Sequence, residues 1–493
     1  MSTVVVIGAG IAGLSAACHL IGQGHRVVVV EREQGPGGRG LRVEQDGYTF
    51  DLGPTVMTMP ELLDEALRAA GSSQAEAVPM RRLDPAYRGL FSDGSQLLVR
   101  DSTEATATEV ERLAGPANAQ AFRELEPFLR ELYETELPNF IDHNFDSPLG
   151  LLHNPVAGLR LLRMGAHRPL ARMINSRVRD PRLQRMLSFQ ALYAGLSPVT
   201  ALGVYAVITY MDTIRGVYLP DGGMGAIGAG MAEVVQRSAR LHYGTRVTAL
   251  LRDQDGSVAG VQTSDGPIAA EAVVCTLDTP VAYRELLADL RPPRVVRRPV
   301  YSPSAVVWHL GVRGDLPQGA AHHNVHFGRA WEQCFTELVD QGRLMSDPSR
   351  LVTVSSLGEP QLAPEGGHTL YVLEPVPNLD GEVDWQRERE PMRARLLDFL
   401  QAAGYPTDIV TERFVTPVEW AELGMGGGTP FGLAHHFRQT GPFRPANHEP
   451  RVPGLFFAGS STVPGVGVPM VLISGKLAAQ RVQRWLTPRR VRP

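Results

Sequence analysis

Short runs of β-branched residues alternate with glycine turns at the start of the chain. Residues 3–7 (TVVVI) and 26–30 (RVVVV) are continuous apolar runs, which predict two buried strands of a parallel sheet. Residues 8–13 are rich in glycine and predict a tight turn, and residues 14–22 predict a helix with small residues on one face. Together these segments predict a βαβ unit, which needs roughly thirty residues.

Helical and strand-like patterns then alternate along the chain, with no internal repeat and no low-complexity linker. This alternation predicts one interleaved α/β protein. We expect a disordered end over the basic residues Arg489 to Arg492. The expected helices span residues 101–136, 385–403 and 470–486, and the expected strands lie within residues 241–253, 272–278, 300–312, 369–376 and 454–459.

Composition narrows the class of protein. The chain has 493 residues, of which 43% are hydrophobic and 20% charged, as is usual for a soluble globular protein. A net charge of −4 argues against a nucleic-acid partner. Cys18, Cys275 and Cys334 show no CxxC spacing, which indicates a reducing compartment and no structural metal. Without an 18-residue apolar run or a basic leader, we expect a cytoplasmic protein, although contact with a membrane surface remains open.

The glycine turn has the spacing of a dinucleotide-binding motif. Gly8, Gly10 and Gly13 follow a predicted strand and open a helix, with Ala12 inside the motif, and this context makes the pattern specific. Gly8 permits the turn, Gly10 lets the backbone approach a pyrophosphate, and Gly13 lets the helix pack on the strand. Free N–H groups at the start of the helix then favour phosphate.

An acidic residue at the end of the second strand completes this motif. Glu31 follows Gly13 by 18 residues, and Arg32 comes next. A carboxylate at this place accepts hydrogen bonds from a ribose 2′-hydroxyl, which favours an unphosphorylated adenosine ribose. NAD and FAD both satisfy the pattern up to this point.

Two following segments favour FAD. Residues 35–39 (GPGGR), with Gly38 and Arg39, resemble the extended fingerprint of FAD proteins of the glutathione-reductase and amine-oxidase groups, in which the Arg faces the cofactor phosphates. Residues 51–55 resemble the segment that passes beside the isoalloxazine ring in these groups, which assigns Gly53, Pro54 and Thr55 to the flavin. Val247 occupies the place at which the groups offer backbone hydrogen bonds to adenine.

The C-terminal region reads as a strand, a glycine-proline loop and a helix that begins near Pro469 or Met470. The start of this helix, with Val468 and Met470, is expected to face the pyrimidine edge of the flavin, where its positive end stabilises negative charge on the reduced ring. Gly459 and Ser460 are expected near the ribityl or phosphate portion.

This C-terminal region resembles the signature of bacterial-type phytoene desaturases. The similarity extends from Val4 to Trp485, and Ser461 is one departure, because related flavoproteins often place an acid or glycine there. Further matching stretches are residues 53–67, 140–149, 188–198, 210–226, 301–307, 344–349 and 429–445.

The resemblance implies an α/β fold in which a Rossmann-like FAD-binding domain carries an inserted mixed-sheet substrate domain and a helical cap. The expected FAD domain is discontinuous, and the cap is also a candidate membrane-contact region. The boundaries that we expect are residues 1–60, 217–298 and 440–493 for the FAD domain, 61–100 and 299–439 for the substrate domain, and 101–216 for the cap.

The implied activity is FAD-dependent desaturation of phytoene, in successive steps towards lycopene, with oxygen or a quinone as electron acceptor. Three alternatives stay open: a desaturase or isomerase of another carotene, an amine- or porphyrinogen-oxidising flavoprotein, and a non-catalytic prenyl-binding escort. An escort needs no intact FAD fingerprint, and this sequence keeps one. The resemblance assigns no catalytic residue.

Several residue patterns remain to be placed. Asp142 and Asp212 are candidate proton acceptors, although either residue could equally be a helix cap or an ion-pair partner. The histidines at 322, 323, 326, 435 and 436 lack acids or cysteines at ligand spacing, so we expect no metal site.

An arginine- and leucine-rich segment over residues 149–185 has two interpretations. Basic amphipathic helices suit anionic lipid headgroups, and the implied substrate lives in lipid. The same arginines could instead pair with the acidic residues 101–136. The first interpretation would place the protein on the inner face of the cell membrane.

Overall fold

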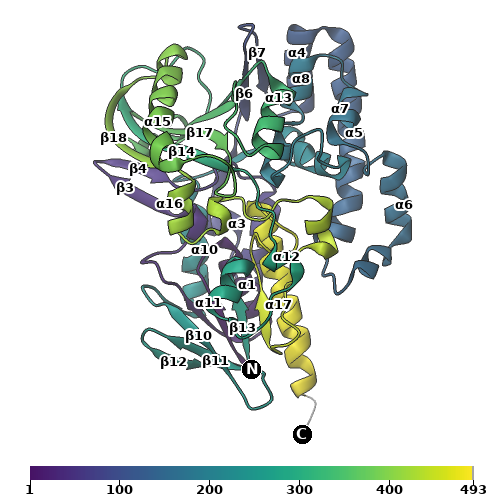
Figure 1. The fold of residues 1–493 in the computed structure, drawn as a ribbon, viewed down its shortest axis with the longest axis vertical. Helices are drawn as coiled ribbons and strands as arrows, with labels where there is room; N and C mark the ends of the chain where they lie inside the picture. Colours follow the sequence, from purple (N-terminus) through teal and green to yellow (C-terminus); the bar gives the residue numbers. More distant parts are fainter. Residues whose placement is uncertain (491–493) are drawn as a thin grey trace.

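A computed structural model describes residues 1–490 and places two sheets along the long axis of the molecule, with helices around them (Figure 1). Among these residues, one sheet has the strand order β19-β13-β1-β2-β9, and all its neighbouring strands are parallel. Because β1 is central and the chain moves outward on both of its sides, the carboxyl end of β1 is where such sheets bind ligands. The strands are β1 (Thr3–Ile7), β2 (Arg26–Val30), β9 (Arg240–His242), β13 (Ala272–Cys275) and β19 (Leu455–Phe457).

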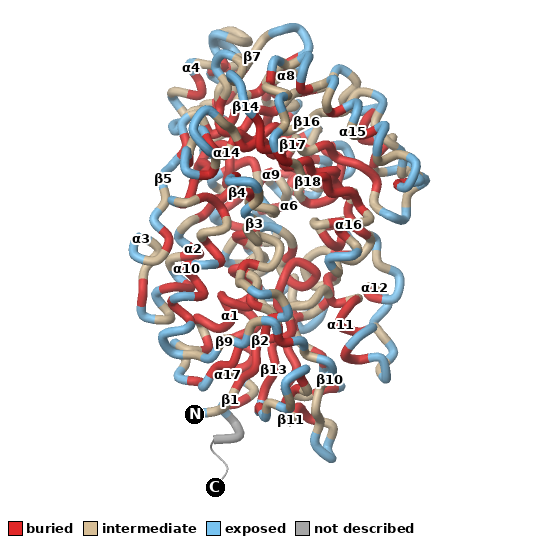
Figure 2. Tube along the Cα trace, turned by 90° about the vertical axis from the view of Figure 1, so that its left-hand side faces the viewer, coloured by how far each residue is buried: buried red, intermediate tan, exposed pale blue. Residues whose placement is uncertain are grey.

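The β-branched runs are continuous because this sheet is covered on both faces. Val4 and Val6 of β1 join a core that includes α1 (Ile11–Gly22) and α17 (Val468–Arg490), whereas Val5 and Ile7 join a core that includes β11 (Val258–Thr263) and α11 (Thr279–Glu285). Successive side chains of a strand point to opposite faces, so both faces need apolar residues. Figure 2 shows these central strands as buried.

Helix α1 begins three residues earlier than the sequence predicted, so Gly13 lies in its first turn rather than before the helix. Helix α1 packs against α17, α10 (Gly225–Gln236) and α2 (Pro60–Ala69). Gly475 of α17 permits this approach, because a Cβ there would lie 2.6 Å from the Ala12 carbonyl oxygen. The first and last helices of the chain therefore pack directly against each other.

The other large sheet is mixed. Its strand order is β18-β14-β17-β16-β15-β6-β7, and β15 pairs with β6 in parallel while the other neighbours are antiparallel. Helix α15 (Trp385–Ala402) covers one face with Met392, Leu396 and Leu400. The strands are β6 (Tyr87–Phe91), β7 (Gln96–Val99), β14 (Ser304–Arg313), β15 (His323–Phe327), β16 (Arg350–Val354), β17 (Gly367–Val376) and β18 (Asp408–Val415).

A group of helices lies beside the mixed sheet (Figure 1). The predicted helix over residues 101–136 is confirmed as α4 (Thr103–Ala114) and α5 (Pro116–Glu136), separated by Gly115 at φ +82°. The following segments are α6 (Pro155–Met164), α7 (Leu170–Asn175), α8 (Pro181–Met186) and α9 (Ala206–Thr209), with short 3₁₀ or π turns η2 (Leu137–Ile141), η3 (Pro148–Leu152), η4 (Phe189–Ala194), η5 (Gly203–Tyr205) and η6 (Tyr210–Ile214).

Residues 241–253, which the sequence predicted as strand, are split between two sheets. Residues up to His242 belong to β9, whereas β10 (Val247–Arg252) pairs with β11 in a small antiparallel sheet with β12 (Gly266–Ala269). The chain turns at Gly244, where φ is +64°. The N–H groups of Gly244 and Thr245 bond to the carbonyl oxygens of Glu33 and Glu31, so this turn holds the end of β2.

The remaining predicted elements are found with small shifts. The predicted strands near residues 300 and 369 are β14 and β17, and the predicted helix 385–403 is α15. Helix α17 extends to Arg490, so the expected disordered end was wrong for Arg489 and Arg490, and Arg492 lies outside the described residues. The shorter elements are β3 (Arg42–Gln45), β4 (Tyr48–Asp51), β5 (Met80–Arg82), β8 (Tyr218–Pro220), α3 (Gln74–Ala77), α12 (Arg294–Arg297), α13 (Trp331–Phe335), α14 (Ser355–Gly358) and α16 (Pro417–Glu422).

The division into FAD, substrate and cap domains stays a prediction. Residues 491–493 of the expected third FAD segment lie outside the described part of the chain. Over the part that the structure describes, no helix combines the length and apolar character needed to cross a bilayer.

Candidate functional site

A cavity of about 1360 Å³ opens at the carboxyl edge of the parallel sheet. Ile7, Val30 and Thr276 line it at or just after the ends of β1, β2 and β13, and the loop after β19 contributes Gly459. The first residues of α1 and α17 also line it. The strand order predicts a ligand site at this edge, and the cavity occupies it.

The glycine turn forms a cradle that side chains would fill. Gly8 has φ +103°, and a Cβ there would lie 2.2 Å from the Thr276 hydroxyl oxygen. A Cβ on Gly13 would lie 2.0 Å from the Gly8 carbonyl oxygen, and one on Gly38 would lie 3.0 Å from the Gly10 Cα. No side chain caps the first N–H groups of α1, so they remain available to phosphate. This geometry fits the pyrophosphate of a dinucleotide.

The Glu31 carboxylate is fixed at the end of β2. Its Oε2 accepts the Ala9 N–H at 2.7 Å, and its Oε1 accepts the Glu33 N–H at 2.9 Å. The side chain is buried but lines the cavity, with lone pairs left for a ribose hydroxyl. Arg32 lines the cavity edge and donates to the Leu423 carbonyl oxygen at 2.8 Å, and Val247 lies at the same end.

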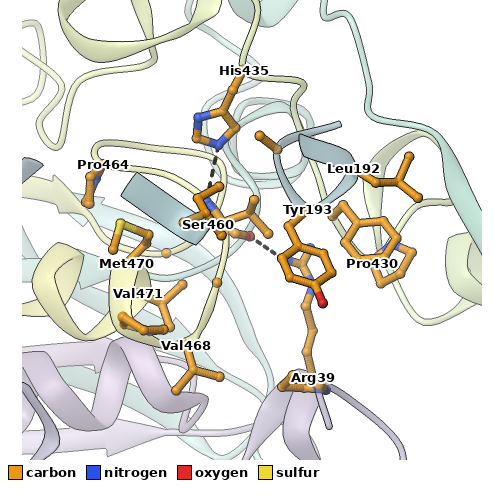
Figure 3. Close-up of a pocket in the computed structure, with 18 of the residues that line it drawn as sticks. Arg39, Leu192, Tyr193, Pro430, His435, Ser460, Pro464, Val468, Met470 and Val471 are labelled. Atoms are coloured by element: carbon orange, nitrogen blue, oxygen red, sulfur yellow. Dashed lines mark hydrogen bonds between the residues drawn. The ribbon is translucent and has the colours of Figure 1, made fainter. Parts of the chain in front are cut away.

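Arg39 joins the loop after β2 to two distant segments. Its guanidinium donates to the Asp278 carboxylate at 2.6 Å and also to the Ser460 hydroxyl. Figure 3 shows Arg39 and Ser460 in this part of the cavity, with Val468 and Met470 from the start of α17. Asp278 lies three residues beyond the end of β13 and was missed from the sequence, although its place after a buried strand was a usable signal.

The predicted flavin loops reach the same cavity. A Cβ on Gly53 would lie 2.0 Å from the Arg39 carbonyl oxygen, so the two loops are in close contact. The Thr55 carbonyl oxygen accepts a hydrogen bond from His323 Nε2 at 2.9 Å. Ser461 lies outside the cavity lining, and its hydroxyl accepts the Thr279 N–H at 2.8 Å. Ser461, which departs from the pattern of related flavoproteins, therefore accepts a hydrogen bond from the first residue of α11.

Every residue predicted to bind the cofactor lines this one cavity, except Gly13, which contacts it through Gly8. The fit to FAD rests on the glycine cradle at one end and on the two loops at the other. The lining set is Gly8, Gly10, Ala12, Glu31, Arg32, Gly38, Arg39, Gly53, Pro54, Thr55, Val247, Gly459, Ser460, Val468 and Met470.

Beyond the dinucleotide cradle, apolar side chains line the cavity in two regions, which we call its arms. One arm runs towards η3 and α6, where the lining side chains Leu152, Leu159 and Leu162 are also exposed to solvent. The other runs towards β15 and α13, where Phe327 and Trp331 line it. The lining of the cavity is mainly apolar, so shape and hydrophobic contact contribute most to the selection of a ligand.

Buried titratable groups also line this cavity. Burial raises the pKa of Asp212 to about 7, although hydrogen bonds from Thr213, Gln190 and Tyr87 oppose this shift. Burial alone raises the pKa of Glu136 well above its usual range, and its side chain has no hydrogen bond or ion pair within residues 1–490. Burial and nearby Arg444 lower the pKa of His435 well below its usual range.

The other sequence candidates have structural roles. Asp142 forms an ion pair with Lys476, so it is a pairing residue rather than a cavity acid. His323 has the backbone carbonyl oxygens of Ala86 and Thr55 within hydrogen-bond distance of its two ring nitrogens, and His326 bonds to the Tyr405 hydroxyl. Among the residues that the structure describes, no three His, Cys, Asp or Glu side chains converge as metal ligands would.

The arginine- and leucine-rich segment pairs only in part with the acidic helices. Arg160 bonds to Glu131 at 2.6 Å, and the Arg177 guanidinium lies over the Phe128 ring. Within the described chain, no ion pair involves Arg163, Arg168 or Arg172. Exposed pairs of this kind contribute about 0–1 kcal/mol, so they do not account for the segment.

Comparison with known proteins identifies the class of protein. Residues 11–483 match the family model of flavin-containing amine oxidoreductases. Solved structures with the same fold include an oxidoreductase of Methanosarcina mazei (TM-score 0.65, 18% identity, covering 96% of this chain and 99% of that one) and cyclohexylamine oxidase of Brevibacterium oxydans (TM-score 0.60, 17% identity, covering 99% of each). The chain belongs to this flavin-containing family, and its cofactor is FAD.

Similarity to curated relatives then places the chain within one group of this flavin-containing family. The chain is 48% identical over 486 residues to phytoene dehydrogenase of Streptomyces griseus, covering 97% of this chain and 94% of that protein. It is 36% identical over 491 residues to the zeta-carotene-forming phytoene desaturase of Myxococcus xanthus, covering 98% and 94%. The resemblance to the phytoene desaturases is therefore confirmed.

Replacing Gly13 tests the cradle. Gly13→Ala places a methyl group against the Gly8 carbonyl, so α1 must shift away from the strand and the phosphate site is lost. We expect purified Gly13→Ala protein to carry about a tenth or less of the wild-type FAD, measured by visible flavin absorbance. Gly35→Ala is the matched control, because open space surrounds Gly35. Full FAD content in Gly13→Ala would contradict the assignment.

Proposed function

We propose that the chain is an FAD-dependent desaturase that introduces successive double bonds into phytoene towards lycopene. The observation that carries this proposal is that the two apolar arms and the predicted flavin loops line one cavity. Phytoene is a hydrocarbon without a polar handle, so only a shaped apolar channel can orient it. The names of the two curated relatives, a phytoene dehydrogenase and a phytoene desaturase, describe the same reaction on the same substrate.

FAD, when bound, accepts a hydride from the substrate. The residues of the chain position the two partners and exclude water. Glu31 and the glycine cradle hold the adenosine and pyrophosphate, and the loop containing Thr55 fixes the flavin end. The start of α17 places its positive end at the same site, where it stabilises negative charge. Oxygen or a quinone is the electron acceptor that we propose for reoxidation.

Other functions are less well supported by the cavity. An amine substrate calls for a polar or aromatic cage, whereas the α6 arm is lined mainly by aliphatic side chains such as Leu151, Leu159 and Leu161. A non-catalytic escort would not need the intact cradle around Gly8 and Gly38. A different carotene as substrate remains compatible with the arms and is an outcome of the assay below.

The assay uses purified protein with FAD and phytoene in liposomes, followed by a visible spectrum of the extracted pigment. We expect a coloured extract whose absorption maxima count the double bonds that were introduced. The Gly13→Ala protein serves as the FAD-poor control. A colourless extract from FAD-loaded protein supplied with an electron acceptor would rule out phytoene and direct the search to other carotenes or amines.

The α6 arm reaches solvent at a surface of exposed apolar side chains on η3 and α6, which we call its mouth. This surface supports peripheral attachment to a membrane. Leu149, Leu152 and Val156 are 74%, 69% and 76% exposed, which is unusual for large apolar side chains gathered on neighbouring turns. Phe437, which also lines the cavity, is 61% exposed. The unpaired Arg163, Arg168 and Arg172 follow in the sequence. We propose that this surface sits on the inner face of the cell membrane and passes the carotene into the arm.

Vesicle flotation tests this surface. Replacing apolar residues at the mouth by serine removes buried area in lipid, so we expect at least about tenfold weaker partition. Replacing Arg160, Arg163, Arg168 and Arg172 by Glu is expected to abolish flotation with anionic vesicles. The mouth variant carries Leu152→Ser, Val156→Ser and Leu159→Ser, and its matched control carries Leu357→Ser, Leu379→Ser and Val410→Ser at exposed sites elsewhere. Unchanged flotation of both the mouth and arginine variants would show that docking occurs elsewhere.

A further inference from the structure

Desaturation removes a hydride from one carbon and a proton from its neighbour, so the second step needs a base. Water is a poor candidate in a channel lined by apolar side chains, and the base must therefore come from the cavity wall. Beyond the cradle, the buried carboxyl and imidazole side chains among the described residues that line the cavity are Glu136, Asp212 and His435. Their surroundings differ in a way that separates them.

Glu136 and His435 are unsuited to accepting a proton. Burial holds Glu136 in its neutral acid form, because no hydrogen bond or charge compensates an ionised carboxylate there. His435 sits beside the buried Arg444, which disfavours a second positive charge on the imidazole. Its Nε2 also accepts the Val466 N–H at 3.4 Å. Each group is thus held in a form that does not gain a proton readily.

The Asp212 carboxylate, on the short π-helical turn η6, differs from these two groups because hydrogen bonds fix one of its oxygens. Its Oδ1 accepts hydrogen bonds from the Thr213 hydroxyl at 2.9 Å and from the Gln190 amide at 3.2 Å. Its Oδ2 has one long bond, 3.4 Å, from the Tyr87 hydroxyl. One oxygen is therefore anchored, while the other has capacity to accept a proton.

Contacts connect Asp212 to the predicted flavin loop. The Tyr87 ring packs against the His323 ring with centroids 5.4 Å apart, and His323 donates to the Thr55 carbonyl oxygen. Tyr193 acts on both Tyr87 and Asp212 electrostatically and lines the cavity near Arg39 and Ser460 (Figure 3). The acid thus belongs to the part of the cavity where the arms meet the cofactor site.

We propose that Asp212 is the proton acceptor of the desaturation. In this step one C–H bond of the carotene breaks and its electron pair leaves as hydride to oxidised FAD, which is reduced by two electrons. The neighbouring C–H bond breaks, its proton passes to Oδ2 of Asp212, and its electron pair becomes the new π bond. Reoxidation of the cofactor by the electron acceptor consumes the proton. This inference rests on the proposed desaturase function.

The environment of Asp212 predicts the pH dependence. The titratable groups that face it are Tyr87 from β6 and Tyr193 from η4, with His323 behind Tyr87, whereas Arg215 of the adjoining turn is directed to Tyr133 and Glu61. Burial sets the Asp212 pKa at about 7, so the carboxylate that accepts the proton forms as the pH rises. We expect the rate to increase about tenfold from pH 6 to pH 8.

The experiment follows flavin bleaching when FAD-loaded protein in liposomes meets phytoene without oxygen or quinone, which isolates the chemical step from reoxidation. We expect Asp212→Asn to bleach at least about a hundredfold more slowly, with no pH dependence in its remaining rate. Asp212→Glu should restore part of the rate and the rising pH profile. Asp142→Asn is the matched acid control, since Lys476 keeps its pairing with Glu65, and its rate should match the wild type.

A second readout separates catalysis from structure. Ionising a buried carboxyl whose pKa is raised opposes folding, and this penalty grows as the pH rises from about 4 to above 7. Asp212→Asn should therefore keep its FAD and have a higher melting temperature than the wild type at pH 8, although it is inactive. A structural role for Asp212 would instead lower both.

Tyr87→Phe provides an independent test if Asp212→Asn does not fold. The Tyr87 hydroxyl stabilises the Asp212 carboxylate, so its removal should move the midpoint of the pH profile upward. An unchanged midpoint would overturn the proposal, as would Asp212→Asn bleaching within about threefold of wild type. Failure of the wild-type protein to bleach with phytoene would refute the desaturase function itself, and this inference with it.

Discussion

The close backbone approach around Gly8, Gly13 and Gly38 is the constraint on which the rest of the structure depends. Each glycine stands where a Cβ would meet another segment: the end of β13, the turn before α1, or the motif itself. Gly475 adds the same requirement between α1 and α17. Because these contacts join the start, middle and end of the chain, the cradle requires segments that are far apart in the sequence to pack together.

This assembly fixes where the chemistry takes place. The cradle and Glu31 provide a polar end, whereas the arms provide an apolar channel that runs from the α6 mouth to α13. Both belong to one cavity, so a nucleotide cofactor and a hydrocarbon meet inside the protein rather than at its surface. The same burial sets the protonation of the lining acids: it keeps Glu136 neutral and leaves Asp212 close to its titration point at neutral pH.

Much of the polar end could be predicted from the sequence, because its residues follow one another along short segments. Gly8, Gly10 and Glu31 have fixed spacings that reflect the turn, the helix start and the strand end. The break at Gly244 was missed because the apolar pattern continues across it, and only the bonds to the end of β2 reveal the turn. Asp278, the partner of Arg39, is far away in the sequence, so no local pattern connects the two.

The arms were not predictable in the same way. Their walls combine η3, η4, α6, α13 and β15, and the apolar residues of each element look like ordinary core positions until the fold places them together. Asp212 and Asp142 were equal candidates from the sequence, and only the structure distinguishes them. Asp212 lies buried in the cavity wall, whereas Asp142 is paired with Lys476.

The most direct measurement is an experimental structure of the FAD-loaded protein with a C40 polyene bound. We predict that the adenosine lies at Glu31, that the flavin lies between Thr55 and the start of α17, and that the polyene passes through both arms beside Asp212. A polyene bound outside this cavity, or a flavin separated from the arms by protein, would contradict it.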